Sequence, residues 1–207
     1  IKSKNTNGLF IKSDITKENS IKKIILSVYK KYKKIDVVIN CAYPKTKKWG
    51  KSFINSNPND IKEDLFNQLG SSILICRNFY KFFAKQGYGN LILLSSIQSL
   101  KSPIFEHYKG TNITSPIEYS AIKSGINSIV KYMAKYSKNK NIRFNSISPG
   151  GIFNNQPKKF LSRYKKDCIN KGVLDPKDLL SAFLFLMNDS SQYINGQNIV
   201  VDDGWSL

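Results

Sequence analysis

Short runs of aliphatic residues alternate along this chain with longer stretches in which apolar residues recur at helical spacing. The short runs predict strands at residues 9–11, 35–39, 91–94, 142–147 and 198–201. The longer stretches predict helices at residues 18–34, about 58–86, 116–137 and beyond Pro176. This alternation is typical of a parallel sheet covered by helices, and 207 residues suit one α/β domain.

Polar or glycine-containing turns follow the C-terminal ends of four predicted strands. These turns contain Asp14, Asn40, Ser96 and Pro149. The C-terminal ends of parallel strands lie along one edge of the sheet, and open parallel sheets bind ligands along that edge. We therefore expect the functional site at this edge.

The composition, 41% hydrophobic and 12% aromatic, is that of a globular protein. No apolar run approaches the roughly 20 residues that span a bilayer, and residues 1–5 lack the apolar block of a signal peptide. The three cysteines, Cys41, Cys76 and Cys168, are far apart and show no metal-ligand spacing. We expect a cytoplasmic protein with no membrane segment and no metal.

The chain is strongly basic, with 33 Lys and Arg against 14 Asp and Glu, a net charge of +19. A nucleic-acid surface gathers such charges on one face, whereas these lysines are spread over the polar sides of almost every predicted helix. The pattern favours solvated helix faces, and we expect no nucleic-acid partner. A basic surface would still attract anionic small molecules.

Tyr119 and Lys123 lie four residues apart, so they share one face of a predicted helix. A phenol has a pKa near 10, and a neighbouring ammonium that lowers it would make proton transfer possible at neutral pH. The same spacing occurs at Tyr29/Lys33, Tyr43/Lys47 and Tyr136/Lys140, where a surface contact explains it. Only Tyr119 stands between a strand that ends in two serines and one that ends in Pro149-Gly150-Gly151.

Seven segments occur in an order that resembles the short-chain dehydrogenase/reductase family over all 207 residues. They are Asp14-Ile15, Asn40-Cys41-Ala42, Asn67-Gln68-Leu69-Gly70, Leu94-Ser95-Ser96, Tyr119-Ser120-Ala121-Ile122-Lys123, Pro149-Gly150-Gly151-Ile152 and Asn195-Gly196-Gln197 with Val201-Asp202-Asp203-Gly204. The resemblance implies a Rossmann-like, doubly wound parallel sheet with helices on both faces. It also implies an oxidoreductase that uses NAD or NADP, which the sequence does not distinguish.

The resemblance implies a role for each catalytic position. Tyr119 would give or take the proton at the reacting oxygen, and Lys123 would lower its pKa and bind the nicotinamide ribose. Ser96 would hydrogen-bond the substrate oxygen, Asn67 would hold a water in the proton relay, and Ser95 would be structural.

The cofactor positions follow in the same way. Asp14 and Ile15 would contact the adenine end, and Asn40, Cys41 and Ala42 would pass under the adenosine ribose. The nicotinamide would be flanked by Pro149, Gly150, Gly151 and Ile152.

Two departures from the family pattern matter. The family's Asn-Asn-Ala-Gly is Asn40-Cys41-Ala42-Tyr43 here, so a side chain replaces a glycine beside the cofactor path and could reshape the mouth of the site. The glycine-rich phosphate loop is also absent. We therefore expect an N-terminally truncated piece that lacks the first β-α-β segment, with an exposed sheet edge beside residues 9–13.

The segment between Ser96 and Tyr119 is longer than is usual in the family and rich in hydrogen-bonding side chains. It contains Glu106, His107, Tyr108, Thr111 and Asn112, and Asn154, Asn155 and Gln156 follow a later strand. These groups favour a hydroxyl-rich substrate, with His107 and Asn154 as candidate contacts besides Ser96, over an apolar pocket. A solvated surface loop is the alternative. His107 is the only histidine, and no pattern in the sequence pairs it with a carboxylate or a metal.

Four further segments resemble the flagellin-modification oxidoreductases, which are associated with making unusual surface sugars. They are residues 87–90, 108–112, 151–157 and 201–207. We expect oxidation or reduction of a sugar or nucleotide sugar. A 3-oxoacyl or general carbonyl reductase remains an alternative, as does a non-catalytic cofactor sensor or scaffold. The resemblance also implies a homo-oligomer, a dimer or tetramer, with Ala121, Ser124 and Gly125 permitting close helix packing.

Overall fold

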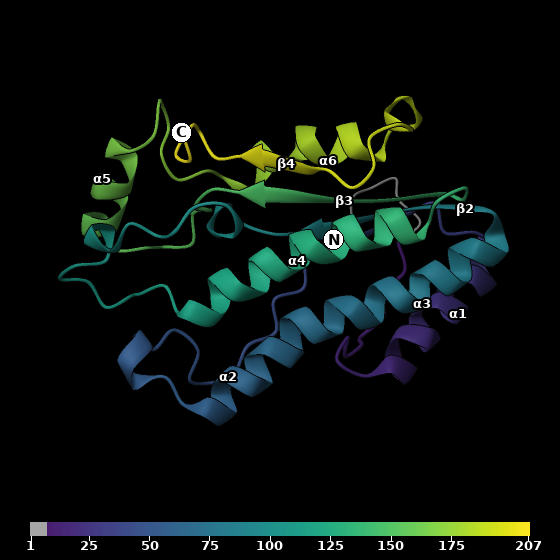
Figure 1. Cartoon of the computed structure of the whole chain (residues 1–207), viewed down its shortest axis with the longest axis horizontal. Coiled ribbons are helices and arrows are strands. Elements are labelled where there is room, and N and C mark those ends of the chain that lie inside the picture. The colour runs from purple at the N-terminus through teal and green to yellow at the C-terminus, as the bar shows by residue number, and fades with distance from the viewer. Residues whose placement is uncertain (1–7) are drawn as a thin grey trace.

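A computed structural model describes residues 8–207 and contains a four-stranded parallel sheet (Figure 1). The strands are β1 (Val37–Asn40), β2 (Tyr88–Leu94), β3 (Asn141–Pro149) and β4 (Asn198–Val201), and they lie side by side in that order. The helices are α1 (Glu18–Tyr32), α2 (Pro58–Leu65), α3 (Ser71–Gln86), α4 (Ile117–Tyr136), α5 (Lys158–Lys166) and α6 (Leu180–Met187). The predicted α/β class is confirmed.

Helices cover both faces of the sheet, with α1, α3 and α4 on one side and α6 on the other (Figure 1). Successive side chains of β2 explain both layers, because they point to opposite faces. Leu91 and Leu93 pack in the core under α3 and α4, whereas Ile92 packs with Leu186 of α6. These three residues are at most 1% exposed, so the continuous apolar run marks a strand that is buried on both faces.

Local sequence signals set the ends of the long helical segment between β1 and β2. Asn57 caps α2 by accepting a hydrogen bond from the Asn59 backbone N–H at 2.9 Å, and Pro58 occupies the first turn. Gly87 ends α3 with a φ of 94°, a conformation that glycine adopts without strain. Between α2 and α3 the chain forms a π-helical turn at Phe66–Gly70, and such turns often accompany functional sites.

The structure corrects two expectations about the elements. Residues 9–11 are not a strand, since no described strand pairs with them, and Phe10 is 91% exposed. Helix α5 was not predicted, because six of its nine residues are Lys, Arg or Ser and resemble a surface loop. Its two apolar anchors, Phe160 and Tyr164, are four residues apart and buried.

Within the described residues, β1 pairs only with β2, so its other edge carries no partner strand. No helix in residues 8–207 is long and apolar enough to cross a membrane.

Candidate active site

A cavity of about 590 Å³ opens at the C-terminal ends of the strands, as the polar turns predicted. Its floor consists of Ser96, Tyr119 and Lys123, and we call these three residues the cavity floor. Cys41, Ala42 and the turn 149–152 also line the cavity. Residues of the segment 103–113 and of helix α5 complete its lining.

Ser96 and Tyr119 meet at the floor. Ser96 follows β2, and its Oγ accepts a hydrogen bond from the Gln98 backbone N–H at 3.2 Å. The Ser96 hydroxyl and the phenol of Tyr119, which α4 presents from its first turn, line the same cavity. Burial raises the pKa of the Tyr119 phenol above its ordinary value, and the nearby Ser96 hydroxyl offsets part of this rise.

The expectation that Lys123 lowers the pKa of Tyr119 is therefore wrong for this structure. The Lys123 ammonium lies 5.5 Å from the centre of the Tyr119 ring, and its Nζ donates a hydrogen bond to the Leu94 carbonyl at 2.9 Å. Helical spacing places two residues on one face but does not decide where a long side chain ends.

Lys123 is only 6% exposed, and burial lowers the pKa of its ammonium to about 8. The end of β2 holds it from two directions: the Leu94 carbonyl binds the Nζ, and the Ser95 hydroxyl donates to the Lys123 backbone carbonyl at 2.9 Å. Ser95 thus has the structural place that we expected for it.

Asn67 lies in the π-helical turn and is half-buried, but it does not line the cavity. Its neighbour Gln68 is only 4% exposed, and neither polar atom of the Gln68 side chain has a hydrogen-bond partner among the described residues. A buried amide without partners is uncommon. Sequence reasoning passed over Gln68 because a glutamine in a helix gives no signal of its own.

The residues expected along the cofactor path divide into two groups. Cys41 and Ala42 line the cavity, and the Asn40 side chain holds their turn by accepting from the Ala42 backbone N–H at 3.2 Å. Asp14 and Ile15 lie outside it: the Asp14 carboxylate binds Thr16, and Ile15 packs against the main core.

Five aromatic side chains of the lining form what we call the cavity wall: His107, Tyr108, Phe160, Tyr164 and Trp205. The Tyr164 and Trp205 rings stack with centroids 5.6 Å apart. The Tyr164 hydroxyl accepts a hydrogen bond from the Gly151 backbone N–H at 2.7 Å, which ties the wall to the end of β3.

His107 has a partner that its sequence neighbourhood did not reveal. Its Nε2 lies 2.6 Å from Oδ2 of Asp167, which follows α5 and is 60 residues away along the chain. His107 is 4% exposed and lines the cavity, as does Asn154. Arg163 of α5 also donates to the backbone carbonyls of Glu106 and Lys109. Together these contacts fix the segment 103–113 to α5.

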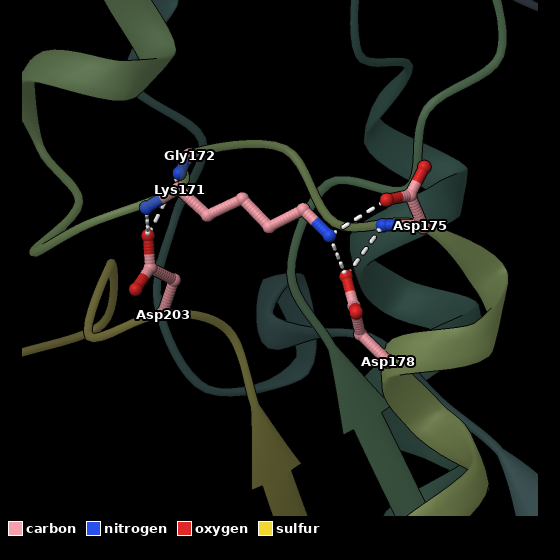
Figure 2. Close-up of polar contacts among 5 residues, drawn as sticks. All are labelled: Lys171, Gly172, Asp175, Asp178 and Asp203. Carbon is pink, nitrogen blue, oxygen red and sulfur yellow. Dashed lines mark hydrogen bonds and ion pairs between the residues drawn. The ribbon is translucent and has the colours of Figure 1, made fainter.

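The loop after α5 is fixed by a second polar cluster (Figure 2). Asp203 Oδ2 accepts backbone N–H groups from Lys171 and Gly172, the latter at 2.7 Å, while the Lys171 ammonium binds Asp175 and Asp178. Its hydrogen bond from Gly172 is the main cause that holds the pKa of Asp203 below its usual range. The chain returning from α5 is thereby joined to the turn that follows β4.

This fold and floor define a class, the NAD(P)-dependent oxidoreductases, and the chain belongs to the short-chain dehydrogenase/reductase family. A family model described as "Enoyl-(Acyl carrier protein) reductase" matches residues 2–206. The chain is 44% identical over 200 residues to "Post-translational flagellin modification protein A" of Campylobacter coli, which covers 96% of the chain and 78% of that protein. It is 31% identical to a 3-oxoacyl-(acyl-carrier-protein) reductase of Buchnera aphidicola, over 96% of the chain and 77% of the relative.

Among solved structures, a short-chain dehydrogenase of Leptospira borgpetersenii with bound NAD⁺ superposes with a TM-score of 0.90. It is 29% identical, and the match covers 100% of this chain and 79% of that one. The cavity has a lining that suits such a cofactor. The small Cys41-Ala42 turn, the 149–152 turn and Lys123 all line it.

Proposed function

We propose that this protein oxidises a hydroxyl group or reduces a carbonyl group of a sugar or nucleotide sugar, in the modification of flagellin or another surface glycan. The observation that carries the chemistry is that Ser96, Tyr119 and the buried Lys123 line one cavity, with the Lys123 ammonium 5.5 Å from the centre of the Tyr119 ring.

The floor residues divide the work of the reaction. A bound nicotinamide supplies or accepts the hydride. Ser96 holds the substrate oxygen beside Tyr119, whose neutral phenol gives up its proton when a carbonyl is reduced. In the oxidation, the phenolate takes that proton from the hydroxyl. The raised pKa of Tyr119 keeps the proton-donating form dominant at neutral pH. Lys123 would hold the nicotinamide ribose through its ammonium.

The cavity wall supports the substrate class. Its rings offer flat apolar surface, and a few polar groups that line the same cavity, including Asn154 and His107, could fix orientation. Glu106 and Asn112 of the long segment are exposed and do not line the cavity, so they do not add to this support. The similarity to a flagellin modification protein supports the same substrate class.

The test uses protein expressed from its complete reading frame. Oxidation of NADH and of NADPH is followed with a panel of keto nucleotide sugars and, in parallel, with acetoacetyl thioesters. We expect turnover with nucleotide sugars. Turnover confined to the thioesters would assign the enzyme to the 3-oxoacyl reductases, which the Buchnera relative makes the second candidate. Cofactor binding without any turnover would favour a sensor or scaffold.

We further propose that the enzyme is a homo-oligomer that works in the cytoplasm. An apolar groove of about 780 Å³ lies between α3 and α4, where Ile73, Tyr132 and Tyr136 are each at least half exposed. Gly125 serves a different purpose from the one expected, because a Cβ there would lie 2.7 Å from the Leu69 side chain of the same chain. Tyr132→Lys should lower the mass measured by light scattering.

The cytoplasmic location is supported by the three cysteines, which are unpaired, as expected in a reducing compartment.

A further inference from the structure

Tyr43 stands where the resemblance would place a glycine, and its ring reaches the cavity floor. The Tyr43 and Tyr119 rings meet edge to face, with centroids 5.9 Å apart and planes at 86°. The Lys123 ammonium lies 5.5 Å from the centre of each of these rings. Tyr43 therefore contacts both members of the pair that the proposed function requires.

The position of Tyr43 is built into the fold. Trp49 packs edge-on against both tyrosine rings, with ring centroids 5.6 Å from Tyr43 and 6.1 Å from Tyr119. Between them in the sequence, Thr46 is held by Asp64 of α2. The Asp64 carboxylate accepts from the Thr46 backbone N–H at 2.7 Å and from its hydroxyl at 2.8 Å. Asp64 is 1% exposed, so this loop is anchored from the protein interior.

The Lys123 ammonium needs such a neighbour. A charged group that is 94% buried requires compensation for lost water. Within residues 8–207 no carboxylate forms an ion pair with Lys123, and its one hydrogen-bond acceptor is the Leu94 carbonyl. The rings of Tyr43 and Tyr119 supply further electrostatic stabilisation of the ammonium, because the ring quadrupole attracts a cation.

We propose that Tyr43 is a positioning residue for the floor: its ring keeps the Lys123 ammonium charged and in place and packs the Tyr119 ring into its reactive position. This inference rests on the proposed function. According to this inference, the aromatic ring of Tyr43 positions Lys123 and Tyr119, and its hydroxyl group is not required.

The experiment compares Tyr43→Leu, which removes the ring and keeps apolar bulk, with Tyr43→Phe, which keeps the ring. Tyr29→Leu is the matched control, because Tyr29 also makes an edge contact with a ring, that of Phe82, but far from the cavity. The titratable groups that face Lys123 are Cys41, Tyr43 and Tyr119, and none of them changes in Tyr29→Leu.

The first measurement does not depend on turnover. The pH dependence of Lys123 acetylation by acetic anhydride, followed by peptide mass spectrometry, gives the pKa of that amine. Loss of a desolvated ring contact should lower this pKa by about one unit in Tyr43→Leu. Tyr43→Phe and the control should stay within about a third of a unit of the unsubstituted protein.

The second measurement is the pH profile of kcat/KM with the substrate that the panel identifies. The basic limb should move to lower pH by the same amount in Tyr43→Leu, with roughly a tenfold loss of kcat at neutral pH, and Tyr43→Phe should restore most of it. An unchanged Lys123 pKa in Tyr43→Leu would overturn the inference. So would Tyr43→Phe behaving like Tyr43→Leu, since that would place the effect in the hydroxyl. An inactive but folded unsubstituted protein would refute the proposed function, and the acetylation result would still decide the role of Tyr43.

Discussion

The cavity floor and the cavity wall are built in different ways. The floor residues come from the end of β2 and one face of α4, and contacts within and between these two regular elements fix them: Ser96 to Gln98, and Lys123 to the Leu94 carbonyl. The wall depends on pairs that are distant in the sequence, such as His107 with Asp167. The floor therefore follows from the family-wide order of elements, whereas the wall can change with one loop or one helix. We therefore propose that the floor sets the type of reaction and that the wall sets the choice of substrate.

The largest expected effect breaks the floor. Tyr119→Phe removes the transferable proton and keeps the ring, so kcat should fall by about a thousandfold, within the range for loss of a general acid or base. The fold, measured by circular dichroism, and most of the affinity for NADH should remain. Tyr136→Phe is the matched control, because Tyr136 has the same spacing to a lysine but lies on the surface. Near-normal rates in Tyr119→Phe would remove the proton-transfer role.

Lys123→Met should cost less in kcat, about a hundredfold, but should also weaken NADH binding. The substitution keeps an apolar chain in the slot and removes the ammonium that donates to Leu94. Because burial lowers the pKa of Lys123 to about 8, the unsubstituted enzyme should show a basic limb near pH 8, above which the ammonium is lost. This limb should be absent in the residual activity of the variant. A limb that persists would belong to another group.

Sequence reasoning named the three residues that form the floor, but it named only His107 and Tyr108 of the wall. Strands β2, β3 and β4 were predicted because buried apolar runs end in polar turns. The raised pKa of Tyr119 was not foreseen, since residue spacing contains no information on burial or on the direction of the Lys123 side chain. The pairing of His107 with Asp167 could not be read from the chain either, because the two residues meet only after α5 has packed against the segment 103–113.

The loop after α5 should respond to acid rather than to substrate. Hydrogen bonds from backbone N–H groups, first that of Gly172, depress the pKa of Asp203 in the folded state. A depressed carboxyl pKa stabilises the fold above the unfolded value of about 3.9, and this contribution is lost as the pH falls through the lower folded value. Asp203→Asn should remove that acid-dependent part of the melting temperature and change kcat little. Identical pH dependence of melting in both proteins would contradict this account.

The smallest effect should come from Asp167→Asn, and it separates wall from floor most directly. The amide keeps the shape of the carboxylate but not its charge, so the His107 ring loses its charged partner and is held less firmly. Helix α5 stays anchored through Arg163. If the wall selects substrate, KM should rise about fivefold with kcat nearly unchanged, the pattern expected when binding is lost equally in the ground and transition states. His107→Asn should give the same split, and the double variant should add little, because both changes remove one contact. A fall in kcat without a change in KM would move His107 from the wall into the chemistry of the floor.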